Sequence, residues 1–169
     1  NFKMNIILHE PEIPQNTGNI GRTCVATGTS LHLIEPLGFK IDDKSLKRAG
    51  MDYWKDLDVH YYTNFQDFLN KNPNANIYMA TTKALNTYSD IKFKDDDFIM
   101  FGSEGSGIPE EILLHYKDNS IRIPMLEQYR SLNLSNSVAI VLYEALRQNS
   151  FKGCQMEGHL HRHSWSEAE

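Results

Sequence analysis

The sequence predicts one α/β domain built on a parallel sheet with helices on both faces. Short apolar runs typical of strands alternate with segments of helical periodicity, which is the pattern of such a sheet. The length of 169 residues suits one ordinary domain. A hydrophobic fraction of 40 % and a charged fraction of 23 % suit a globular core. We find no internal repeat or linker, so a single domain is sufficient.

Six strands are predicted from apolar runs that stop at proline, glycine or polar residues. The first is residues 5–10, where Ile6, Ile7 and Leu8 precede Pro11. The others are residues 31–35, 59–62, 77–82, 98–101 and 121–125.

Five helices are predicted between and after these strands, at residues 18–27, 44–53, 65–70, 109–116 and 134–148. Asn16 or Thr17 is the expected N-cap of the first helix, because short polar side chains bond the free amides of a first turn. Pro109 opens the fourth helix, where proline is favoured.

The last predicted helix carries two stripes. The first has the spacing of a buried face and comprises Leu134, Val138, Val141, Leu142, Ala145 and Leu146. The second comprises Asn136, Ile140, Tyr143 and Arg147. A helix that is apolar on more than one side either lies deep in the core or packs against a second subunit. We favour a homodimer interface, with deep burial as the alternative.

Composition excludes several classes of protein. No run of about 18 apolar residues is present, so no membrane span is expected. The N-terminus has no secretory signal pattern. Two cysteines, Cys24 and Cys154, cannot form a disulfide framework, and Cys24 is interpreted as a core residue rather than a nucleophile. A cytoplasmic protein is expected.

The net charge of −5 does not suit RNA binding through bulk positive charge, so an RNA site must be a local patch. The richest candidate is residues 40–55, where five Lys or Arg side chains and three Asp leave +2. A solvated helix face is the alternative interpretation.

The domain is expected to span residues 1–156, and residues 157–169 are interpreted as a loose or appended tail. His159, His161 and His163 lie in this tail, and Cys154 lies just before it. Their spacing is irregular, so no native metal site is expected.

Three polar, glycine-rich segments are candidates for a ligand site. Residues 16–23 contain Gly18 and Gly21, which permit close backbone approach, and Arg22, whose forked guanidinium suits phosphate. Two of the segments follow predicted strands, and ligands of parallel sheets bind beyond the carboxyl ends of strands. A helix cap followed by a surface arginine is the alternative for the first segment.

The second segment, residues 101–109, has three glycines and Glu104, whose carboxylate suits a cationic ligand better than a phosphate. A plain tight turn is the alternative. The third covers residues 121–125 and 130–137. Backbone groups around Ile123 could bind the edge of an adenine ring, and Ser131 and Asn133 could cap the last helix, bind a ligand, or both.

Together and in this order, these segments resemble the three motifs of the SPOUT superfamily of S-adenosylmethionine-dependent RNA methyltransferases. The resemblance extends from about residue 4 to residue 152. Residues 9–19 and 46–53 are similar to the group that 2′-O-methylates the wobble nucleotide, position 34, of certain leucine tRNAs.

The resemblance implies features that the residue pattern does not. The C-terminal part would form a deep trefoil knot. The cofactor would be S-adenosyl-L-methionine, with S-adenosyl-L-homocysteine as its product, and no metal would be needed. The enzyme would be a homodimer acting on the anticodon stem-loop of tRNA.

The resemblance also implies roles for particular residues. Cofactor binding is expected of Ala80, Gly102, Ile123, Met125, Ser131 and Leu132. Catalytic roles are expected of Arg22, Glu104 and Asn133, and RNA binding of Arg22, Lys47, Arg48 and Arg130, with Lys55 beside them. Free arginine stays protonated below about pH 12, so we favour Arg22 as a clamp on phosphate or ribose and leave the proton acceptor open.

Three other functions are kept as alternatives. The first is a related enzyme that acts on ribosomal RNA or on another tRNA position. The second is a noncatalytic RNA-binding protein with this fold. The third is a nicotinamide-dependent oxidoreductase, which the missing G-x-G-x-x-G pattern disfavours.

Overall fold

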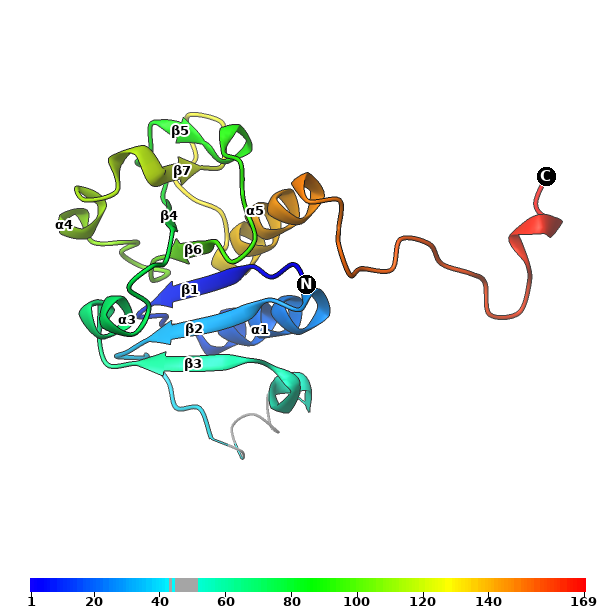
Figure 1. Cartoon of the computed structure of the whole chain (residues 1–169), viewed down its shortest axis with the longest axis horizontal. Coiled ribbons are helices and arrows are strands. Elements are labelled where there is room, and N and C mark those ends of the chain that lie inside the picture. Colours follow the sequence, from blue (N-terminus) through cyan, green and yellow to red (C-terminus); the bar gives the residue numbers. More distant parts are fainter. Residues whose placement is uncertain (43, 45–51) are drawn as a thin grey trace.

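The computed structural model describes residues 1–42, 44 and 52–169, and within these ranges the strands form one seven-stranded parallel sheet (Figure 1). The sheet order is β3-β2-β1-β6-β4-β7-β5. The strands are β1 (Asn5–His9), β2 (Ser30–Ile34), β3 (Val59–Tyr62), β4 (Ile77–Ala80), β5 (Asn86–Thr87), β6 (Phe98–Phe101) and β7 (Ser120–Arg122).

Helices cover both faces of the sheet, as the sequence predicts. The helices are α1 (Pro14–Thr27), α3 (Phe65–Lys71), α4 (Glu110–Leu113) and α5 (Leu134–Gln148), with short 3₁₀ helices η1 (Asp52–Asp56), η2 (Tyr88–Asp90), η3 (Lys117–Asn119) and η4 (Trp165–Glu167). Ile6 and Leu8 pack in one cluster with α1, η1 and α5, whereas Ile7 packs in a second with α3 and α4. Successive side chains of a strand point to opposite faces, so both faces need a cover.

The centre of the sheet is the most buried part of the described structure. Every residue of β1, β2 and β6 is buried. Strands buried on both faces are continuous apolar runs rather than alternating ones. This explains why the sequence predicts these three strands closely.

Helix α1 begins at Pro14, four residues before the predicted start, and the predicted cap at Asn16 or Thr17 is wrong. Ile13 is the N-cap and has no side-chain cap bond. Proline tolerates the first helical position because the N–H that it lacks has no partner there. The helix ends at Gly28, whose φ of 66° is left-handed.

Several other elements are predicted to be longer than they are in the structure. Strand β7 ends at Arg122, two residues before Pro124, which has no N–H for a ladder. Strand β4 ends at Ala80, and α4 spans only Glu110–Leu113. Strand β5 is not predicted, because its two polar residues have no apolar pattern.

The predicted helix at residues 44–53 lies largely outside the described residues. Its last two positions open the turn η1, from which Trp54 packs against α1. A Cβ at Gly21 would lie 2.9 Å from the ring of Trp54, so glycine permits this close approach.

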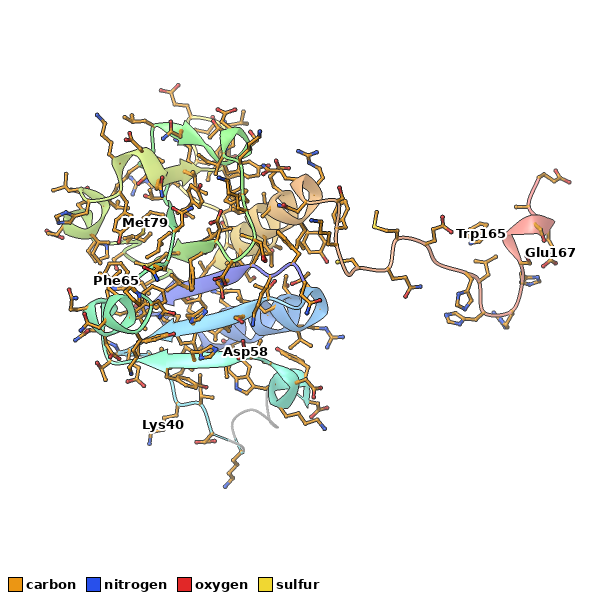
Figure 2. All side chains as sticks on the ribbon, in the orientation of Figure 1. Lys40, Asp58, Phe65, Met79, Trp165 and Glu167 are labelled. Carbon is orange, nitrogen blue, oxygen red and sulfur yellow. The ribbon has the colours of Figure 1, made fainter. Side chains whose placement is uncertain are left out.

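The tail runs away from the body of the molecule (Figures 1 and 2). Residues 155–164 contain no helix or strand, and η4 follows them. Trp165 is 64 % exposed. The interpretation of residues 157–169 as an appended segment stays a prediction.

A buried histidine, His32 of β2, links this strand to the edge strand β3 and to β1. Its Nδ1 lies 2.8 Å from the hydroxyl of Tyr62, and its Nε2 lies 3.2 Å from Oδ1 of Asn5. The amide nitrogen of Asn5 donates to Asp96 and Asp97, so Oδ1 is left as an acceptor. These partners suit a neutral imidazole that carries its proton on Nε2.

Burial, with smaller effects of His60 and Lys3 and against the opposite effect of Asp58, lowers the pKa of His32 to about 3 from 6.5. Between these two values the unfolded chain binds a proton that the folded chain does not. The free energy of unfolding therefore falls as pH falls below 6.5.

We expect His32 to contribute about 2 kcal/mol to the loss of unfolding free energy between pH 7 and pH 5. Urea unfolding at several pH values should show a shallower pH dependence for His32→Gln than for the wild type. His115→Gln, at an exposed position, should keep the wild-type dependence. Equal pH dependence in His32→Gln and wild type would contradict this account.

Candidate functional site

A cavity of about 450 Å³ lies where the loops after β4, β6 and β7 meet the starts of α1 and α5. In a parallel sheet the carboxyl ends of strands share one edge, and ligands bind there. Its lining comprises Ile13, Asn16, Ala80, Thr81, Thr82, Lys83, Phe101, Gly102, Ser103, Glu104, Gly105, Ser106, Gly107, Ile108, Ile121, Ile123, Met125, Ser131, Leu132, Asn133, Leu134, Ser137 and Val141. The three segments singled out in the sequence therefore contribute to one cavity.

The loop after β6 is a closed turn. A Cβ at Gly102 would lie 2.1 Å from the carbonyl carbon of Gly107, so only glycine permits this close contact between the two ends of the turn. The amide of Gly107 donates to the carbonyl of Ser103 at 3.0 Å, and the hydroxyls of Ser103 and Ser106 lie 2.7 Å apart. The turn holds its own shape and presents Glu104 on its outer side. Gly102 thus has a structural role in addition to the predicted contact with a cofactor.

The carboxylate of Glu104 binds the entry to α1. Its Oε1 accepts from the amide of Glu12 at 2.8 Å, and its Oε2 accepts from the amide of Ile13 at 2.8 Å and from Nδ2 of Asn16 at 3.1 Å. Burial by itself would raise the pKa of Glu104, but these hydrogen bonds outweigh it and hold the pKa below its ordinary value. Glu104 is therefore ionised, with both oxygens engaged.

Asn16 and Asn133 continue this chain of hydrogen bonds to the last helix. Nδ2 of Asn133 donates to Oδ1 of Asn16 at 3.1 Å. Oδ1 of Asn133 accepts from the amides of Ser135 and Asn136, at 2.9 and 3.3 Å, and so caps α5. One network thus joins a side chain from each of the three segments.

The six predicted cofactor positions lie together. Ala80, Gly102, Ile123, Met125, Ser131 and Leu132 all line the cavity. Glu104 and Asn133, two of the predicted catalytic residues, line it as well. The structure places these residues around one space, and their roles stay predictions.

The predicted basic residues lie elsewhere. Arg22 is exposed on α1, with its guanidinium 5.6 Å from the ring centroid of Tyr53, and it is not among the lining residues. Arg130 is exposed in the loop before α5 and does not line the cavity either. Lys47 and Arg48 lie outside the described residues. Lys55 is exposed on η1.

Sequence reasoning missed one part of the lining. Thr81, Thr82 and Lys83 follow β4, and Lys83 forms an ion pair of 3.1 Å with Glu110. Nη1 of Arg122 donates to the carbonyl of Thr82 at 3.2 Å, which ties this loop to β7. Thr81 and Thr82 end the strand predicted at residues 77–82, and Lys83 follows it, so the carboxyl end of that strand was the signal that could have found them.

Two expected absences can be compared with the described residues. In residues 1–42, 44 and 52–169, no group of three or more His, Cys, Asp or Glu side chains is arranged to hold a metal ion. In the same ranges, no helix is long and apolar enough to cross a membrane.

Comparison with known proteins gives consistent matches. The model of the SpoU rRNA Methylase family matches residues 3–143. The tRNA (cytidine(34)-2′-O)-methyltransferase of Saccharophagus degradans is 46 % identical over 150 residues, which are 88 % of this chain and 97 % of that protein.

Solved structures agree with this match. A protein whose structure was solved for insight into the 2-OH methylation of C/U34 on tRNA superposes with a TM-score of 0.83 and 39 % identity, covering 88 % of this chain and 97 % of that one. The AdoMet-bound rRNA methyltransferase of Sinorhizobium meliloti gives a TM-score of 0.74 and 26 % identity, covering 86 % of this chain and 56 % of that one. With its parallel sheet and matched motifs, the chain belongs to the SpoU rRNA Methylase family.

Proposed function

We propose that this protein transfers a methyl group from S-adenosyl-L-methionine to the ribose 2′-oxygen of nucleotide 34 of tRNA. The observation that carries the proposal is the single cavity into which the three motif segments converge. The relative that acts on cytidine 34 matches nearly the full length of both chains, which supports this nucleotide as the target. We extend the proposal to leucine tRNAs from the resemblance of residues 9–19 and 46–53. Such an enzyme would act in the cytoplasm.

The cavity suits the cofactor. Its volume lies within the range of sites for small ligands, and Ile123, Met125 and Leu132 add apolar surface for a flat ring. The ionised carboxylate of Glu104 contributes negative charge at the wall. When bound, S-adenosyl-L-methionine supplies a methyl group on a positively charged sulfur, and transfer leaves S-adenosyl-L-homocysteine.

Glu104 acts in this proposal as a fixed anion. Both of its oxygens accept hydrogen bonds, and its lowered pKa makes it a weak base. The carboxylate therefore holds the loops and favours a cationic ligand, without accepting the ribose proton. Asn133, whose amide is oriented by Asn16 and by its capping bonds, offers a polar group of fixed direction at the cavity.

The active form in this proposal is a homodimer. Ile140 and Tyr143 are 38 % and 46 % exposed on α5, and α5 packs beside α1, which carries Arg22. A second copy covering this face would bury the two apolar side chains. Because Arg22 does not line the cavity of its own chain, we infer that it serves the cavity of the partner. There it would bind the phosphate or ribose of the RNA.

We infer that the chain is knotted as the resemblance implies. Strand β7 lies between β4 and β5, although β4 and β5 are joined by only a few residues. The segment that returns from β5 to β6 is bonded to the end of α5, where Gln148 and Asn149 donate to the carbonyls of Ile91 and Phe93. The later elements β7 and α5 thus lie against a loop made by earlier residues. Such threading is rare among folds.

A tRNA surface is proposed around Arg22, Lys55 and Arg130, which are exposed. Lys47 and Arg48 belong to the same proposal on sequence grounds. Phosphate contacts by these side chains would make binding weaken as salt increases.

The proposed reaction predicts transfer of radiolabelled methyl groups from S-adenosyl-L-methionine to purified tRNA. Nuclease mapping should place the label on the 2′-oxygen of nucleotide 34. A transcript in which that nucleotide carries a 2′-deoxyribose is the control and should stay unlabelled. Label at another tRNA position or in ribosomal RNA would support a related enzyme with a different target. Cofactor binding without label in any RNA would favour a noncatalytic protein.

Arg22→Ala should lower kcat for methyl transfer by about 100-fold or more, because a fixed charged donor at the reacting centre is lost. Cofactor affinity, measured by calorimetry, should stay near that of the wild type. Arg162→Ala, in the tail, should keep wild-type activity. Wild-type kcat in Arg22→Ala would remove Arg22 from the reaction.

Mixed dimers test whether Arg22 serves the partner. Ser131→Trp should block the cavity, since Ser131 is exposed and lines it. Dimers that combine one Arg22→Ala chain with one Ser131→Trp chain should recover about half of the wild-type activity, because both defects fall on one cavity. Recovery of no activity, with dimers intact on gel filtration, would place Arg22 in the cavity of its own chain.

A further inference from the structure

Two loops at the cavity exchange hydrogen bonds through their carboxylates. Oε1 of Glu12 accepts from the amide of Gly105 at 2.9 Å. In return, Glu104 accepts from the amides of Glu12 and Ile13, each at 2.8 Å. Glu12 lies between β1 and α1, and Glu104 lies in the turn after β6, so these bonds join residues about 90 positions apart in the sequence. We call these three hydrogen bonds the reciprocal carboxylate bonds.

The segment that carries Glu12 is held in place by contacts other than the reciprocal carboxylate bonds. The amide of Gly38 donates to the carbonyl of Pro11 at 2.9 Å. A Cβ at Gly38 would lie 2.8 Å from Cα of Glu12, so the two backbones are in close contact. The segment before α1 is therefore packed against a third loop and serves as the fixed side.

The turn after β6 depends on the reciprocal carboxylate bonds for its orientation. It joins β6 at Gly102, and Gly107 has a φ of 70°, so glycines stand at both ends of the turn. Residues 103–106 between them line the cavity. The turn keeps its internal shape through its own bonds, and the bonds to the segment before α1 fix its orientation relative to that helix.

We propose that Glu12 is a positioning residue, which fixes the turn at residues 102–107 in the orientation that shapes the cofactor cavity. Its carboxylate acts on the turn through the amide of Gly105 and is not part of the cavity lining. This proposal rests on the proposed function, because the benefit of a fixed turn is tighter binding of S-adenosyl-L-methionine.

The two carboxylates in the reciprocal carboxylate bonds also have hydrogen-bond partners. Glu12 and Glu104 are both acidic, and carboxylates close together repel each other. Each accepts backbone N–H groups of the other loop, and hydrogen bonds to an ionised acceptor are stronger than neutral ones. A glutamine at position 12 keeps an oxygen acceptor for Gly105 and loses only the charge. An alanine loses both.

The test compares Glu12→Ala, Glu12→Gln and the wild type, with Gln15→Ala as a matched exposed change in the same segment. In the unliganded proteins, amide hydrogen exchange of residues 103–107 should be faster by about tenfold in Glu12→Ala. Gln15→Ala should exchange at the wild-type rate, and Glu12→Gln, which keeps a weaker acceptor, at a rate between those of the wild type and Glu12→Ala. This measurement needs neither cofactor nor RNA, so its outcome is independent of the proposed function.

Calorimetry and kinetics provide the second measurement. The Kd and KM for S-adenosyl-L-methionine should rise by about tenfold in Glu12→Ala, whereas the KM for tRNA and the Tm should stay near wild type. Glu12→Gln should restore part of the cofactor affinity, because its amide oxygen still accepts from Gly105. Wild-type hydrogen exchange in Glu12→Ala, or a Glu12→Gln variant that is no closer to the wild type than Glu12→Ala in these two measurements, would overturn the proposal. A wild-type protein that binds no S-adenosyl-L-methionine would instead overturn the proposed function.

Discussion

The structure of the cavity depends on one chain of hydrogen bonds, from Glu104 through Asn16 to Asn133. Each of these residues comes from a different segment, and the segments are separated by 88 and 117 positions along the chain. Two of them also have partners in the backbone: Glu104 binds the entry to α1, and Asn133 caps α5. These hydrogen bonds join the three segments at one edge of the sheet.

The hydrogen bonds to Glu104 also set the charge of the site. A carboxylate that accepts three hydrogen bonds keeps its negative charge in a partly buried place, because the bonds offset the cost of burial. The carboxylate of Glu104 is therefore already oriented before a ligand with a positively charged sulfur binds. A fixed group stabilises charge without reorganising when a ligand binds, which is an advantage that water does not offer.

The sheet provides the rigid support for these loops. Strands β1, β2 and β6 are buried throughout, and apolar clusters fill both faces. The loops that follow β4, β6 and β7 therefore leave one edge of a firmly packed layer. The glycines at positions 102 and 107 confine the chain reversal after β6 to a tight turn. A firm sheet and the loops at its edge together give a cavity whose walls come from distant parts of the sequence.

By itself, the sequence determined the elements that depend on local pattern. Strands β3 and β6 and helix α5 begin and end where apolar periodicity predicts, and Asn133 caps α5 as one of the interpretations expected. Only the tertiary structure decided that α1 begins at Pro14, that β5 exists, that Arg22 lies off the cavity, and that Glu12 and Glu104 exchange bonds. Periodicity reports burial over a few neighbouring residues. Contacts between residues about 90 positions apart depend on how the strands are ordered in the sheet, which local pattern does not carry.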